Sequence, residues 1–177
     1  MADYPFPSGK AEHASYTLLR GWWENLESDR GERAALRRAG TLTEVMLSPA
    51  FHRLLHLLRR GGFQIAEQRY PKLAIIAGLA ARLRITEEAA LGVQCGSPRK
   101  AAAKKPDVSE LRMRRLLACD DLEELYTLLR RVLALLDNQA NLTDLAAVVW
   151  NWRKLDEKHP FDPRRQLALD YYTAAPL

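Results

Sequence analysis

Residues 109–137 read SELRMRRLLACDDLEELYTLLRRVLALLD and predict two consecutive helices that carry closely spaced arginines. Ser109 is a good N-cap for the first helix. Asp120 or Asp121 can cap the second helix, whose acidic first turn also suits the helix dipole. Apolar residues recur at steps of three and four along the second helix, which predicts one buried stripe formed by Leu122, Leu125, Leu129, Val132 and Leu136.

Most arginines of this stretch have no acidic neighbour in their own helix; the exception is Arg114, which has Glu110 four residues before it. Arg130 and Arg131 fall at the two edges of the polar arc, and neither has a carboxylate three or four residues away, where helical neighbours lie. The same comparison finds no acid for Arg112 or Arg115. Such arginines either pair with an acid elsewhere in the tertiary structure or bind an anion from outside the chain.

A second arginine pair ends an earlier predicted helix. The sequence SDRGERAALRRAG predicts a short helix that stops at Gly40, and Arg37 and Arg38 form its last turn. Neither arginine has an acid three or four residues away. Cations at this position also favour the helix C-terminus, so the pair has both a structural and a ligand-binding interpretation.

Composition is consistent with a globular protein and excludes few functions. The chain has 177 residues, of which 28% are charged, with a net charge of +5 and a pI near 9.4. Cys95 and Cys119 are isolated, which fits a reducing compartment better than a disulfide scaffold. The first ten residues, MADYPFPSGK, lack the apolar core of a signal peptide, and no apolar run is long enough to span a bilayer. The sequence therefore predicts a cytoplasmic protein without a membrane partner.

Helical signals occur along most of the chain, and no segment shows the alternation of a strand. Further helices are predicted at residues 15–26, 49–60, 72–84, 143–158 and 164–172. Periodicity fails between residues 86 and 107, where glycines, prolines and a run of basic residues occur. The predicted fold is all-α, with two small helical bundles joined by a basic, Ala/Lys-rich linker. The first bundle is predicted at residues 1–94, the linker at 95–108 and the second bundle at 109–177.

The sequence contains no recognisable catalytic or cofactor motif. There is no GxSxG elbow, no Gly-rich phosphate loop, no HExxH and no paired Cys/His ligand set. His52 and His56 are four residues apart, but no third metal ligand accompanies them. Asp120 and Asp121 are explained by a helix N-terminus without chemistry. We therefore predict a protein that is not an enzyme and that holds neither a cofactor nor a metal.

Three functions from different classes remain open. The first is sequence-independent binding of nucleic acid, in which arginines of several helices, each without an acidic partner, bind phosphates. The second is a helical scaffold whose arginine clusters bind acidic protein partners. The third is an enzyme with an unrecognised site. The salt dependence of binding to random-sequence nucleic acid separates the first from the second.

Four segments, in this order, resemble the CasB family, the small subunit of the type I-E CRISPR Cascade complex. They are LLRGWWENLESDRGERAALRRA, LSPAFHRLL, YTLLRRVLALL and WNWRKLDEK, and the resemblance extends from about Tyr16 to Tyr172. It implies an all-helical, non-catalytic protein that forms a homodimer beside other Cascade subunits. There it would brace the duplex of crRNA and target strand and hold the displaced non-target DNA strand of the R-loop, in antiviral defence.

The resemblance also implies which residues bind nucleic acid. Arg112 corresponds to a basic position of the family's central helix, and Arg153 and Lys154 follow its tryptophan pair. Arg114 and Arg115 and the long Ala/Lys linker depart from the family pattern. Together, the residue patterns and the resemblance give these candidates: Arg37, Arg38, Arg112, Arg115, Arg130, Arg131, Arg153 and Lys154.

Overall fold

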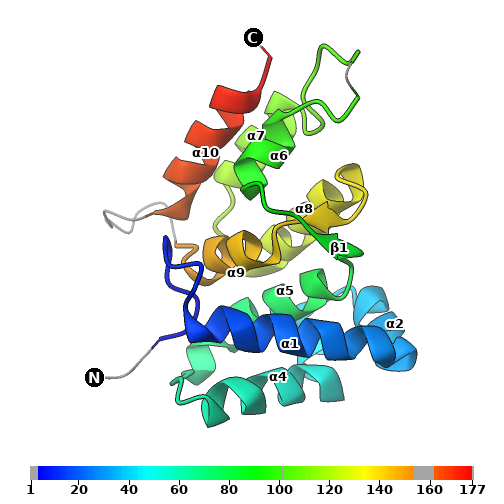
Figure 1. The fold of residues 1–177 in the computed structure, drawn as a ribbon, viewed down its shortest axis with the longest axis vertical. Helices are drawn as coiled ribbons and strands as arrows, with labels where there is room; N and C mark the ends of the chain where they lie inside the picture. The colour runs from blue at the N-terminus through cyan, green and yellow to red at the C-terminus, as the bar shows by residue number, and fades with distance from the viewer. Residues whose placement is uncertain (1–3, 101, 154–161, 177) are drawn as a thin grey trace.

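The computed structural model describes residues 4–100, 102–153 and 162–176. Its elements follow one another as shown in Figure 1. They are α1 (Ala14–Ser28), α2 (Arg30–Arg38), α3 (Leu42–Met46), α4 (Pro49–Arg60), the 3-10 helix η1 (Glu67–Arg69), α5 (Tyr70–Ala80), β1 (Ile85–Thr86), α6 (Leu91–Gly96), α7 (Glu110–Leu117), α8 (Leu122–Leu135), β2 (Gln139–Ala140), α9 (Leu142–Trp150) and α10 (Pro163–Ala174). The predicted all-α class is confirmed.

Side-chain caps set several helix boundaries where the sequence predicts them. Ser48 Oγ accepts a hydrogen bond from the Phe51 amide, 3.2 Å away, and Pro49 occupies the first position of α4. At α8 the cap is Asp121, whose carboxylate accepts the Glu124 amide at 2.8 Å. These caps satisfy amides that would otherwise lack a partner at each helix start.

Helix α5 lies at the centre of the molecule, between α1 and α4 on one side and α8 and α9 on the other (Figure 1). Its residues 73–80 are all buried. Two tryptophans of α1 fix this arrangement, because Trp23 Nε1 donates to the Ala80 carbonyl at 3.0 Å and Trp22 Nε1 donates to the Ala50 carbonyl at 3.1 Å. The buried apolar residues form one cluster with members in both halves of the chain, so α5 shares its core with α8 and α9.

Two short strands form although the sequence shows no strand pattern. Ile85 and Thr86 pair in parallel with Gln139 and Ala140. The Arg84 amide extends this contact by donating to the Asn138 carbonyl at 2.9 Å. Strands of two residues are too short to show an alternating pattern, which explains why the sequence did not predict them.

The predicted linker at residues 95–108 begins inside a helix. Cys95 and Gly96 belong to α6 and are buried, and α6 packs against α10 at the upper end of the molecule (Figure 1). Val108, at the other end of the segment, is also buried, and its carbonyl accepts the Tyr171 hydroxyl at 2.7 Å. The division of the chain into two bundles stays a prediction.

Helix α9 is shorter than the predicted helix at residues 143–158, because it ends at Trp150. Lys72 Nζ and an Arg69 guanidinium nitrogen donate to the Trp150 carbonyl, at 3.2 and 3.1 Å. The Trp152 indole donates to the Cys119 carbonyl at 2.9 Å, which holds the chain in its new direction. Tertiary donors therefore replace the next helical turn.

Of the helices in the described part of the chain, none has both the length and the apolar character needed to cross a membrane.

Candidate nucleic-acid interface

The carboxyl end of α2 is fastened to α8. The Tyr126 hydroxyl of α8 donates to the Ala39 carbonyl at 2.9 Å, and Arg130 Nη1 donates to the Gly40 carbonyl at 3.4 Å. Arg37 is exposed in the last turn of α2. Arg37 and Arg130 are 93 residues apart in the sequence. The hydrogen bonds of Tyr126 and Arg130 to the chain just after α2 bring these two arginines to the same border between α2 and α8.

Arg130 is held by stacking rather than by an acid. Its guanidinium carbon lies 5.3 Å from the centroid of the Tyr126 ring, four residues earlier on the same helix. Across the described residues, Arg130 forms no ion pair with a carboxylate. Stacking orients the guanidinium while leaving its charge available, which is the arrangement that an arginine needs to receive a phosphate.

Arg82, just after α5, joins this site, and the sequence analysis missed it. One of its terminal nitrogens donates to the Arg37 carbonyl, at the end of α2. Burial lowers the pKa of the Arg82 guanidinium, and the nearby charges of Arg130 and Arg37 lower this pKa further. We call Arg37, Arg82 and Arg130 the arginine cluster. Arg82 also has no acid three or four residues away in the sequence, so the comparison applied to Arg130 would have selected it.

Arg33 fixes the turn that carries Arg82. Its Nε donates to the Ala81 carbonyl at 3.1 Å, and a terminal nitrogen donates to the Leu83 carbonyl. An ion pair at 3.5 Å joins the same guanidinium to Glu27. Arg33 of α2 thus bonds to the turn after α5, and Arg82 of that turn bonds back to α2. These contacts hold α2 and the turn together, so the cluster is preorganised.

Two carboxylates beside the cluster accept hydrogen bonds from backbone amides. Glu44 accepts the Gly40 amide at 2.6 Å, and Glu123 accepts the Leu42 amide at 3.1 Å. Neither forms an ion pair with Arg130 in the part of the chain that the structure describes. The border between α2, α3 and α8 therefore keeps three guanidinium groups close together without direct neutralisation, and an anion would relieve their mutual repulsion.

Arg38 and Arg131 are exposed next to members of the cluster in the sequence, and neither forms an ion pair within the described residues. The two candidates on α7 lie elsewhere, at the upper end of the molecule (Figure 1). Arg115 finds an acid in the next helix, since it pairs with Glu124 at 3.1 Å. Arg112 contacts the cap residue of its own helix, Ser109, at 3.5 Å.

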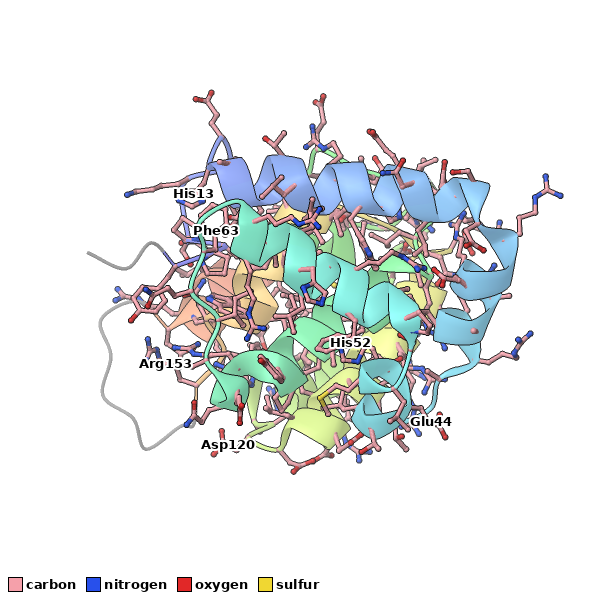
Figure 2. The ribbon with its side chains drawn as sticks, turned by 90° about the horizontal axis from the view of Figure 1, so that it is seen from below. His13, Glu44, His52, Phe63, Asp120 and Arg153 are labelled. Carbon is pink, nitrogen blue, oxygen red and sulfur yellow. The ribbon has the colours of Figure 1, made fainter. Side chains whose placement is uncertain are left out.

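The last two candidates lie beyond α9 and apart from the cluster. In Figure 2, Arg153 lies on the left of the molecule, and Glu44, which borders the cluster, lies on the right. The Arg153 carbonyl accepts a hydrogen bond from Arg164, whose guanidinium also binds Asp120 at 2.9 Å. Lys154 lies outside the described residues. The structure therefore unites Arg37 and Arg130 with Arg82 but does not bring Arg112, Arg115 or Arg153 to the same place.

Gly78 of α5 leaves the space that Tyr126 occupies. A Cβ at this position would lie 2.5 Å from the Tyr126 hydroxyl oxygen and 3.0 Å from two ring carbons. We expect Gly78→Ala to lower the free energy of unfolding by about 1–3 kcal/mol through overpacking. Gly21→Ala, where nothing lies within 4 Å of the new Cβ, is the control and should not destabilise. Urea unfolding measures both variants, and equal stability would contradict the close packing of Tyr126.

Residues 32–172 match the family model of the CRISPR-associated protein Cse2. The chain belongs to the Cse2 family. Cse2, also called CasB, is the small subunit of type I-E CRISPR Cascade, so the family resemblance seen in the sequence is confirmed. No curated protein matches the chain.

Among solved structures, a chain of E. coli Cascade bound to a PAM-containing dsDNA target resembles the Cse2-family fold described above. The TM-score is 0.61 at 21% identity, and the match covers 89% of this chain and 93% of that chain. At this identity the likeness concerns the fold.

Within the described residues, no group of three or more His, Cys, Asp or Glu side chains could hold a metal ion.

Proposed function

We propose that this chain is a non-catalytic, cytoplasmic subunit of a type I-E Cascade complex in antiviral defence, and that it binds nucleic acid without regard to sequence. In this role it braces the duplex of crRNA and target strand and stabilises the displaced non-target strand of the R-loop. Membership of the Cse2 family supports the assignment of this chain to a Cascade complex. The observation that carries nucleic-acid binding is the convergence of Arg37, Arg82 and Arg130 from three segments.

The chemistry of the arginine cluster favours phosphate as its ligand. A guanidinium is a planar fork that can donate two parallel hydrogen bonds to phosphate oxygens. Contacts to phosphates position a strand but carry no base information, so such a site is independent of sequence. Arg38 and Arg131, exposed beside the cluster residues, extend the proposed contact. Arg112, Arg115, Arg153 and Lys154 remain candidates for separate contacts within the complex.

Protein partners are the other part of the proposal, namely the remaining Cascade subunits and a second copy of this chain. Large apolar side chains are exposed on the paired helices α7 and α10: Leu111, Leu169 and Tyr172. The Tyr172 hydroxyl donates to Glu110 at 3.3 Å, which joins the two helices at this surface. Exposed apolar groups of this kind support a contact with protein rather than with a phosphate backbone.

The lifetime of the R-loop tests this function in the assembled complex. Cascade that carries Arg37→Ala and Arg130→Ala should assemble normally but release the displaced strand sooner, because that strand loses two charged contacts. Single-molecule measurement of R-loop closure gives the lifetime. Equal lifetimes would contradict the proposal. Failure of the complex to assemble would instead favour the scaffold hypothesis, in which these arginines bind acidic surfaces of proteins.

A further inference from the structure

The outer face of α4 is a second basic surface, and none of the candidates above lies on it. Exposed basic side chains recur along this helix of twelve residues: His52, Arg53, His56, Arg59 and Arg60. The helix contains no acidic residue. In Figure 2, which views the molecule from below, α4 lies on the near side and His52 projects from it. The opposite face of α4 is apolar and buried, so all of its charge is presented outward.

The basic side chains of α4 differ in the contacts that they make. Arg59 donates to the Tyr70 hydroxyl at 2.5 Å, and its guanidinium carbon lies 5.7 Å from the centroid of that ring. Arg53 forms an ion pair with Glu32 of α2. Arg60 and His56 form no ion pair with any residue that the structure describes. The guanidinium of Arg59 is thus oriented by a tyrosine rather than by an acid, and Arg60 is exposed beside it.

A surface cavity of about 570 Å³ between α1 and α4 adjoins this face, and Arg53, His56 and Arg60 line it. Its two acids are already engaged, since Asp29 accepts the Glu32 amide at 3.1 Å and Glu32 pairs with Arg53. The lining carries two arginines and two carboxylates and so has no net formal charge. Because Arg60 forms no ion pair within the described residues, it is the guanidinium of this lining that is open to an anion.

We propose that the outer face of α4 binds the sugar–phosphate backbone of a single nucleic-acid strand. Arg53 and Arg60 are seven residues apart, or about 10 Å along the helix, so this face is long enough to contact more than one phosphate of a strand. Helix α5 lies between α4 and α8, so this face is separate from the arginine cluster (Figure 1). One chain can then hold two strands at once.

Stoichiometry tests this inference. Titration of the full chain with a labelled, random-sequence DNA of eight nucleotides should give two bound strands per chain. Arg59→Gln with Arg60→Gln should leave one, because the face of α4 loses the charges of its last turn. Arg37→Ala with Arg130→Ala should also leave one, and the four substitutions together should leave none. Arg20→Gln with Arg165→Gln removes the same charge from exposed positions of α1 and α10 and should leave two.

The outcomes separate this inference from the proposed function. One strand per wild-type chain, with binding lost in the Arg37/Arg130 variant and unchanged in the Arg59/Arg60 variant, overturns the α4 surface alone. Loss only in the Arg59/Arg60 variant overturns the arginine cluster alone. If Arg59→Gln unfolds the chain, His56→Gln with Arg60→Gln spares the contact of Arg59 with Tyr70 and should again leave one strand. Equal competition by poly-L-glutamate would also overturn a site for nucleic acid.

Discussion

Replacing Gly92 and Gly96 together by alanine should lower the free energy of unfolding by about 2–6 kcal/mol, since overpacking costs about 1–3 kcal/mol at each site. Both glycines lie in α6 where it meets α10. A Cβ at Gly92 would lie 2.6 Å from the Leu167 carbonyl oxygen, and one at Gly96 would lie closer still to the Tyr171 carbonyl oxygen. These neighbours are backbone atoms, so relief requires the two helices to separate.

Urea unfolding followed by circular dichroism measures this effect. The matched control is Gly21→Ala with Gly31→Ala, two helical glycines at which a Cβ meets no atom closer than 3.7 Å. Alanine is the better helix former, so the control should be at least as stable as the wild type. If both double variants unfolded at the same urea concentration, α6 and α10 could not be packed as closely as described.

Replacing Arg37 and Arg130 by alanine should weaken binding to random-sequence nucleic acid by roughly 30- to 1,000-fold, if each charged contact contributes about 1–2 kcal/mol. Neither guanidinium is paired with a carboxylate of the described residues, so each is available for a phosphate. Arg82 is kept in this variant, because it also bonds the backbone of α2 at Arg37. Its removal would combine a loss of charge with a loss of structure. Fluorescence anisotropy at low salt measures the affinity.

Two arginines with acidic partners provide the control for that experiment. Arg114 pairs with Glu110 in its own helix, and Arg99 pairs with Asp107 and Asp137 at 3.6 and 2.9 Å. Arg99→Ala with Arg114→Ala removes the same charge as the cluster variant and should change the affinity much less. Equal losses in the two variants would mean that net charge, rather than the arrangement of the cluster, determines binding.

The sequence predicts the helices well because their boundaries depend on local chemistry. Ser48 with Pro49, and Asp121 ahead of α8, begin helices where the residue types predict them. The end of α9 at Trp150 was not predictable in this way, since it depends on donors from Lys72 and Arg69 far away in the chain. Helix α6 has only six residues, too few to establish a period.

The candidate site was predictable in part for the same reason. The absence of local acids singled out Arg130, which forms no ion pair with the residues that the structure describes, but it also singled out Arg115, whose partner Glu124 comes from the next helix. A rule based on neighbours within one helix cannot see tertiary ion pairs. Nor can it show that Arg37 and Arg82 meet, because that contact depends on how α2 ends against the turn after α5.

A salt titration of binding to random-sequence single-stranded DNA tests the arginine cluster most directly. The slope of log affinity against log salt counts phosphate contacts, with roughly 0.7 for each contact on a single strand. We expect Arg37→Ala with Arg130→Ala to reduce the magnitude of this slope by about 1.4, and Arg99→Ala with Arg114→Ala to leave it unchanged. Parallel lines for the wild type and the cluster variant would contradict the claim that these arginines bind phosphates.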